Sequence, residues 1–144
     1  MSDFRFRFPI QVRFADLDPL WHVNNARYLT YLEQARSGYL QHLGLWDGKD
    51  FFKIGVIVGD IHIRYLAPVL LGQAIHVETR VAKIGNKSFT FEYQIVDDAT
   101  GKLCATAESI MVTFDYHSST SIPVPAAWRE IIARYEKQDF SVQA

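Results

Sequence analysis

The sequence is poor in cysteine, in long hydrophobic runs and in net charge. Cys104 is the only cysteine, so neither an intrachain disulfide nor an all-cysteine zinc site can form. Fifteen Lys and Arg balance sixteen Asp and Glu, which argues against broad nucleic-acid binding, since that depends on excess positive charge. No apolar run approaches the roughly 18–20 residues that span a bilayer. The first residues alternate charged and aromatic side chains and lack the apolar block of a signal peptide. We therefore expect a cytoplasmic protein that binds neither nucleic acid nor membrane.

The remaining composition is that of an ordinary folded domain. The chain has 144 residues, of which 49% are hydrophobic, 14% aromatic and 22% charged. A chain of this length buries roughly two-thirds of its unfolded surface, which is enough for a core without metal or disulfide support. We expect one domain over residues 1–144.

One long helix is predicted between residues 25 and 43. Tyr28, Leu32, Ala35 and Tyr39 follow one another at the spacing of a helix face about five turns long. Asn24 or Asn25 is suited to the N-cap, and Gly44 to a left-handed C-terminal cap.

Alternating apolar and polar residues predict strands in most of the rest of the chain. They lie at about residues 5–14, 60–65, 75–81, 89–95 and 102–114, and a short helix follows residues 123–125. Short connections between the later strands indicate hairpins and an antiparallel sheet. The fold class is α+β. One helix covers one face of such a sheet and leaves an edge strand open, which favours pairing with a second copy of the chain.

The segment before the long helix concentrates groups that could do chemistry. Asp18, His22 and the expected helix start at Asn25 lie within eight residues. A helix start offers free N–H groups and partial positive charge, which suit an oxyanion. A nearby carboxylate can attack a carbonyl or activate water, so the segment suits acyl transfer from an activated ester. The same residue types also occur in ordinary turns and helix caps, and Asp16 fits that structural role better.

The same segment resembles a family signature. Residues 18–28 read DPLWHVNNARY and residues 31–36 read YLEQAR. They resemble the signature of hotdog-fold acyl-CoA thioesterases of the 4-hydroxybenzoyl-CoA thioesterase and YbgC-like family. The resemblance covers about residues 6–115.

This resemblance implies a hotdog fold: a curved antiparallel five-stranded sheet around one long helix, here with a short C-terminal helix. It implies a homodimer, which can pair into a homotetramer, with active sites at the subunit interface. The family's catalytic carboxylate falls on Asp18, as nucleophile or general base, and its oxyanion-binding amide falls on Asn25. It implies no metal and no cofactor, with coenzyme A entering only as part of the substrate.

A second resemblance, to plant-type acyl-ACP thioesterases, bears on His22. Their Asp-x-Asn-x-His-Val-Asn-Asn pattern matches here at Asp18 and at residues 22–25, but Leu20 replaces the first Asn. In those enzymes the Asp, the first Asn and the His of the pattern are the proposed catalytic residues. The resemblance therefore implies a role for His22, but the arrangement of three is incomplete here. Trp21 replaces the smaller residue that is usual before the histidine, which bears on the acyl group accepted.

Further residues are predicted to bind substrate. Trp21 and Tyr28 are candidates for lining an acyl pocket, while Arg64, Lys87 and Ser88 are candidates for the coenzyme A phosphates. Glu33, on the predicted helix, can pair with Arg36 or Arg27.

We predict an acyl-CoA thioesterase that releases free acid and coenzyme A by means of Asp18 and the helix N-terminus. The alternatives are a non-catalytic acyl-CoA-binding hotdog module, an acyl-ACP thioesterase, and a hotdog dehydratase, although the His-Phe-Pro-Gly type motif of dehydratases does not occur in the sequence.

Overall fold

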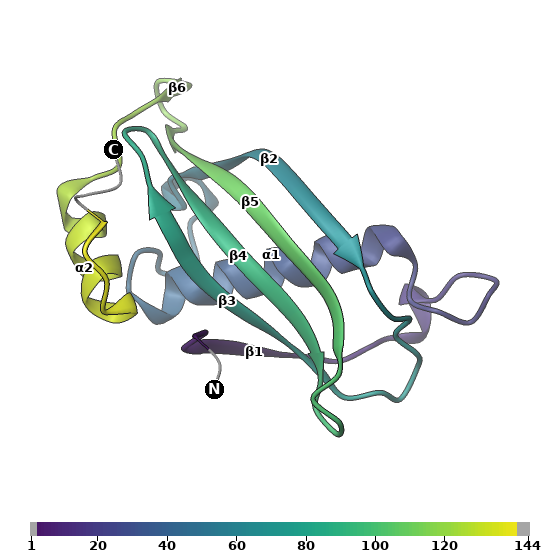
Figure 1. Ribbon diagram of the computed structural model, residues 1–144. Coiled ribbons are helices and arrows are strands. Elements are labelled where there is room, and N and C mark those ends of the chain that lie inside the picture. The colour runs from purple at the N-terminus through teal and green to yellow at the C-terminus, as the bar shows by residue number, and fades with distance from the viewer. Residues whose placement is uncertain (1–2, 141–144) are drawn as a thin grey trace.

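A curved antiparallel sheet wraps around one long helix in the computed structural model, which describes residues 3–140 (Figure 1). The sheet order is β1-β3-β4-β5-β2, and a short sixth strand pairs with the end of β5. The strands are β1 (Phe6–Ile10), β2 (Val56–Tyr65), β3 (Ile75–Ile84), β4 (Ser88–Asp97), β5 (Leu103–Asp115) and β6 (Thr120–Ser121). The helices are α1 (Asn25–His42), α2 (Ala126–Glu136) and two 3-10 turns, η1 (Phe14–Asp16) and η2 (Phe51–Lys53). The expected α+β hotdog architecture is confirmed.

Helix α1 begins and ends where the sequence indicates. The Asn24 side chain accepts a hydrogen bond from the Ala26 amide at 2.9 Å, which fixes the N-cap. Beyond the last turn, Gly44 adopts φ +75°, a left-handed conformation that glycine enters without strain. The 18 residues of α1 make five turns, as predicted.

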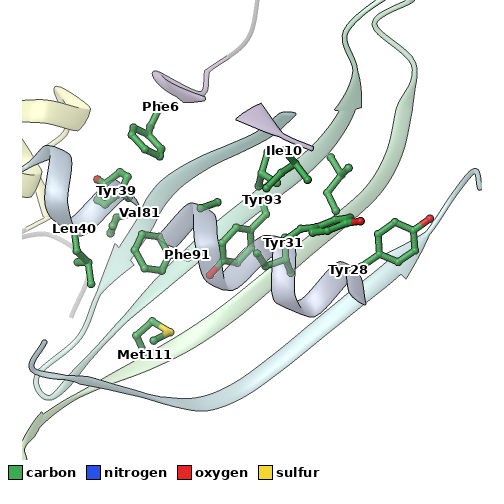
Figure 2. Close-up of a cluster of buried hydrophobic side chains, with 14 of the residues drawn as sticks. Phe6, Ile10, Tyr28, Tyr31, Tyr39, Leu40, Val81, Phe91, Tyr93 and Met111 are labelled. Atoms are coloured by element: carbon green, nitrogen blue, oxygen red, sulfur yellow. The ribbon is translucent and has the colours of Figure 1, made fainter. Parts of the chain in front are cut away.

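The core lies between α1 and the concave face of the sheet (Figure 2). Tyr31 and Tyr39 project from the helix toward the strands and are almost fully buried. The Tyr39 ring meets Phe91 of β4 edge to face, with centroids 5.1 Å apart. Aromatic pairs in this geometry add about 0.5–1.5 kcal/mol beyond their buried area, so these contacts hold the helix along the sheet.

The convex face of the sheet carries charged side chains in rows across the strands. Pairing places Arg80 of β3, Glu92 of β4, Glu108 of β5 and His62 of β2 side by side. Arg80 and Glu92 are joined at 2.6 Å. This face differs in character from the apolar concave face, as the alternation of the sequence predicts.

The two edges of the sheet are β1 and β2. Proline at position 9 lies in edge strand β1, where a missing N–H is tolerated, as expected. Strand β2 pairs on one side with β5, and no described residue pairs with its other side. Ile57, Val58 and Tyr65 are exposed along it.

Several elements differ from the sequence-based expectation. The first strand ends at Ile10, because Asp16 accepts the Arg13 amide and turns the chain into η1. Strand β2 starts at Val56, four residues earlier than predicted, since a bulge at Gly59 interrupts its alternation. Neither η2 nor β6 was predicted. Cys104 packs inside as expected, and burial raises the pKa of its thiol.

Candidate functional site

A tight loop delivers Asp18 and His22 to the start of α1. The Asp18 amide donates to the His22 carbonyl and the Trp21 amide to the Asp18 carbonyl, both at 2.9 Å. Trp21 closes this turn at φ +63°, a left-handed conformation that is strained for a tryptophan. Such strain persists only when the surroundings enforce it. Here Leu17 and Val23 bridge the base of the loop.

The Asp18 carboxylate is half-buried and oriented by its own loop. Its Oδ1 accepts the Leu20 amide at 2.9 Å. The carboxylate lines a cavity together with His22. A carboxylate held in this way can present its other oxygen to a molecule in the cavity.

The first amide of α1 is free to bind a further acceptor. The neighbouring amides are taken: Asn24 N–H donates to the Asp16 carbonyl, and Ala26 and Arg27 N–H donate to Asn24. The Asn25 amide has no partner among the described residues, and Asn25 lines the same cavity as Asp18. The cavity therefore combines a carboxylate with a free N–H at the positive end of an 18-residue helix.

This cavity, which we call the Asp18 pocket, has a volume of about 480 Å³. Its far wall comes from the end of β2 and the segment after it. Tyr28 and Tyr65 form an aromatic pair there with centroids 4.9 Å apart, and the Tyr65 hydroxyl donates to the Asn25 carbonyl at 2.8 Å. The lining residues are Asp18, His22, Val23, Asn25, Tyr28, Tyr65, Leu66, Ala67 and Pro68.

Asp16 lies behind the loop and does not line the pocket. Its fully buried carboxylate accepts from the Arg13 amide, the Arg13 guanidinium and the Tyr31 hydroxyl, the last at 2.7 Å. Burial raises the pKa of Asp16, but the hydrogen bonds from Arg13 and Tyr31 outweigh it and leave that pKa below its usual value. Asp16 therefore has the capping role expected for it.

The structure brings together only some of the predicted site residues. Asp18, His22, Asn25 and Tyr28 line one pocket. Trp21 does not line that pocket; it is 65% exposed and packs edge-on against Phe14.

The three candidates for phosphate binding lie elsewhere in the chain. Arg64 lines a separate cavity of about 380 Å³ on the convex face. Ser88 begins β4 and Lys87 precedes it. Ser88 pairs with Val112, which also pairs with Ile57, at the opposite end of β2 from Tyr65. Within one chain, Lys87 and Ser88 are therefore remote from the Asp18 pocket, whereas Arg64 directly precedes Tyr65 of that pocket but lines the other cavity.

Sequence reasoning missed the wall formed by Tyr65, Leu66, Ala67 and Pro68. A bridge between His22 and Leu70 and a hydrogen bond from Val23 N–H to the Val69 carbonyl hold this segment against the loop. These contacts join residues more than forty positions apart, and the local pattern carries no signal of them.

Within residues 3–140, no three or more His, Cys, Asp or Glu side chains gather in a way that could hold a metal ion. In the same range, no helix has both the length and the apolar character needed to span a membrane.

Comparison with known proteins connects this geometry to one group of enzymes. A sequence profile described as the Thioesterase-like superfamily matches residues 12–132. The long-chain acyl-CoA thioesterase FadM of Escherichia coli K12 is 28% identical over 128 residues, 89% of this chain and 97% of FadM. The acyl-CoA thioester hydrolase YbgC of E. coli O6:H1 is 27% identical over 116 residues, 80% of this chain and 86% of YbgC. The crystal structure of a Thermus thermophilus thioesterase with coenzyme A and Zn superposes with a TM-score of 0.85 at 33% identity, covering 96% of this chain and all of that one.

Proposed function

The chain belongs to the thioesterase-like superfamily, and from this we propose that it is a thioester hydrolase that cleaves an acyl-CoA into free acid and coenzyme A. One observation carries the proposal: the Asp18 carboxylate and the free Asn25 amide line the same pocket. FadM and YbgC, which match over most of their own lengths, are named an acyl-CoA thioesterase and an acyl-CoA thioester hydrolase, which supports the same reaction.

The Asn25 amide is the proposed oxyanion donor. When the thioester carbonyl carbon is attacked, its oxygen becomes negative, and an N–H at a helix start stabilises that charge. The Tyr65 hydroxyl holds the Asn25 carbonyl, so the peptide units at this helix start are fixed before substrate arrives. Removing one such donor in other enzymes slows turnover by about 100- to 1,000-fold.

Asp18 supplies the attack in one of two ways. As a general base it takes a proton from water, the hydroxide adds to the carbonyl carbon, and the C–S bond breaks to release the thiolate of coenzyme A, which takes up the proton. As a nucleophile its oxygen adds first and expels the thiolate, and water then hydrolyses the acyl–Asp18 anhydride. The thiolate is a good leaving group, so neither route needs a strong general acid. His22, which lines the same pocket, is proposed to orient substrate or water.

The open edge of β2 is the proposed dimer interface. A two-fold axis pairs two copies of one strand antiparallel. With the axis at the middle of β2, Tyr65 of one copy lies beside Val56 of the other. The Asp18 pocket then adjoins the partner's opposite end of β2, and the partner's Lys87 and Ser88 lie at that same end.

The proposal also covers the coenzyme A phosphates, the oligomeric state and the location of the enzyme. Lys87 and Ser88 of the partner, with Arg64, are proposed to bind the phosphates of coenzyme A. The dimer can pair into a tetramer, and the enzyme is proposed to act in the cytoplasm.

The test is thiol release from a panel of acyl-CoAs by wild type, Asp18→Asn and Asp18→Ala. Loss of a general base predicts a fall in kcat of about 100- to 10,000-fold, whereas Glu130→Gln, an exposed carboxylate of α2, serves as the matched control and should keep wild-type turnover. Unimpaired turnover by a folded Asp18 variant would contradict the proposed role. After a single turnover in ¹⁸O-labelled water, label in Asp18 would identify the nucleophilic route with water attacking the Asp18 carbonyl of the anhydride, because the general-base route puts the label in the free acid alone.

Two further outcomes would redirect the assignment. Binding of acyl-CoA without thiol release by wild type would identify a non-catalytic acyl-CoA-binding module. Release from acyl-ACP at a much higher kcat/KM than from acyl-CoA would identify the protein as an acyl-ACP thioesterase.

A further inference from the structure

A second cavity lies between α1 and the other end of β2. Its volume is about 380 Å³. It is mainly apolar and has one buried cation, Arg36, so we call it the Arg36 cavity. It is lined by Glu33, Arg36, Ser37 and Leu40 of α1, by Phe51, Ile54, Val56, Ile57 and Val58, and by Met111 and Tyr116.

Arg36 is poorly paired for a buried charge. The residue is only 9% exposed. Its Nη1 is buried and has no hydrogen-bond partner within the described part of the chain. Its Nη2 lies 3.7 Å from Oε2 of Glu33, a carboxylate that is 67% exposed. Glu33 thus pairs with Arg36, one of the two options from sequence, but beyond hydrogen-bond distance.

The Tyr93 hydroxyl is a polar neighbour of Arg36. Burial raises the pKa of that hydroxyl, and the positive charge of Arg36 and hydrogen bonds with Ser109 and Arg36 oppose this. The hydroxyl is shared with Ser109 at 2.7 Å, and Nη1 of Arg36 still has no partner among the described residues. A buried donor without an acceptor destabilises a protein by about as much as a lost hydrogen bond, and by more when the donor is charged. A ligand oxygen would remove this penalty.

The position of the cavity indicates which ligand could supply that oxygen, and this step rests on the proposed function and its dimer. In one chain, the Asp18 pocket is lined by Tyr65 at one end of β2 and the Arg36 cavity by Val56 at the other end. Along α1, Asn25 of the pocket and Arg36 of the cavity are about 17 Å apart. Antiparallel pairing of two β2 strands places the Asp18 pocket of one copy beside the Arg36 cavity of the other. An acyl chain whose thioester lies at Asp18 would then extend into the partner's cavity.

We propose that the Arg36 cavity is the acyl-chain site of the dimer and that Arg36 selects acyl groups that carry an oxygen acceptor away from the thioester. The apolar wall, including Leu40, Ile57 and Met111, packs against the methylene groups. The guanidinium of Arg36 donates to a hydroxyl, keto or carboxylate oxygen on the same chain. The substrate class is therefore an oxygenated acyl-CoA rather than a plain alkanoyl-CoA.

The first experiment measures kcat/KM of the wild-type protein on acyl-CoAs matched in length. Each set contains the plain alkanoyl thioester, its ω-hydroxy form and its ω-carboxy form, over a range of lengths. A hydrogen bond to a charged group contributes about 1.5–3 kcal/mol, so we expect a preference of about 10-fold or more for an oxygenated form at its best length. The hydroxy and carboxy arms show which oxygen Arg36 binds. Equal kcat/KM for all three forms at every length would overturn the inference.

The second experiment compares Arg36→Met, which retains a long apolar side chain, with Arg36→Lys, which retains a donor and the charge. Arg36→Met should reduce the ratio of oxygenated to plain kcat/KM by about 10-fold, and Arg36→Lys should retain part of it. Arg134→Met, at an arginine of α2 whose side chain is 73% exposed, is the matched control and should keep the wild-type ratio. An unchanged ratio in Arg36→Met would refute the selective role.

Two measurements keep the result interpretable. If Arg36→Met does not fold, inhibition of wild type by free alkanedioates and by alkanoates of equal length replaces it, and equal inhibition would count against the inference. Sedimentation of each variant tests whether Arg36 instead holds the dimer together, since a monomeric Arg36→Met would point to an interface role and overturn selection. A wild-type protein that hydrolyses no acyl-CoA would contradict the proposed function itself, whereas hydrolysis indifferent to the oxygen would contradict only this inference.

Discussion

Two tyrosines on the same face of α1 each donate a hydrogen bond to a carboxylate from a distant segment, yet the two pairs differ in charge. Tyr31, near the start of the helix, binds Asp16 at 2.7 Å. Tyr39, two turns later, binds Glu136 of α2 at 2.5 Å. The first pair holds the loop that carries Asp18, and the second holds the C-terminal helix against the sheet.

The difference lies in the donors around each carboxylate. Asp16 also receives the amide and the guanidinium of Arg13, and its pKa is lowered although burial alone would raise it. Among the described residues, Glu136 receives only the Val81 amide in addition to Tyr39. Burial therefore dominates and raises the pKa of Glu136, and the hydrogen bonds and the more distant Arg80 and Arg5 offset it only in part. The surroundings of Asp16, beside the proposed active site, thus favour its ionised form, while the surroundings of Glu136, at the other end of α1, favour its protonated form.

The largest effect should come from removing the ionised member. Asp16→Ala leaves the Tyr31 hydroxyl and the Arg13 amide without their acceptor, and we expect a loss of about 3 kcal/mol in the free energy of unfolding. Glu136→Ala is the matched comparison and should lose less, about 2 kcal/mol, because fewer donors are stranded. Urea denaturation at neutral pH measures both. A loss for Glu136→Ala that equals or exceeds that for Asp16→Ala would remove the distinction between the two pairs.

The loss in the free energy of unfolding should differ less between the two tyrosine variants than between the two carboxylate variants. Tyr31→Phe removes a donor from a fully buried carboxylate, and we expect a loss of about 1.5 kcal/mol. Tyr39→Phe should lose about 1 kcal/mol, since Glu136 can take up a proton when its donor is gone. Only Tyr31→Phe should also lower kcat, because it loosens the loop that carries Asp18. A kcat reduced equally in both variants would show that the Asp16 pair has no special relation to the active-site loop.

The local half of this structure could be read from the sequence. The helix face, the Asn24 cap and the glycine turn at Gly44 depend on residues within a few positions of one another. The grouping of Asp18, His22, Asn25 and Tyr28 is also local, because a short loop and one helical turn bring them to the same pocket.

The rest depends on contacts between distant segments. The wall at Tyr65 reaches the pocket through strand pairing, and Glu136 reaches Tyr39 across 97 positions. Charge balance at a buried carboxylate depends on which donors arrive from such segments. The local spacing of residues does not predict this charge balance. For the same reason, the unpaired Nη1 of Arg36 could be found only from the structure.

The pH dependence of stability should have opposite signs at the two carboxylates. The pKa of Asp16 is lower in the folded than in the unfolded chain, so the unfolded state binds more protons as the medium becomes acidic. The stabilisation from ionised Asp16 is therefore present above the ordinary aspartate pKa and is lost as pH falls through the folded value. Asp16→Asn should flatten the acidic limb of a plot of unfolding free energy against pH. A limb as steep as that of wild type would show that Asp16 does not titrate as described.

The smallest effect should come from Glu136→Gln, which removes the charge and keeps an acceptor for Tyr39 and Val81. The folded pKa of Glu136 is raised, so between the unfolded and folded values the folded state holds more protons and stability falls as pH rises. The stabilisation from protonated Glu136 is complete below the unfolded pKa and is lost on passing upward through the folded one. At neutral pH the variant should lie within about 1 kcal/mol of wild type, and relative to wild type it should gain stability from acidic toward neutral pH. The measurement is urea denaturation of both proteins across this range. If the unfolding free energy of the variant falls relative to that of wild type as pH rises, the sign assigned to Glu136 is wrong, and the contrast between the two ends of α1 is lost.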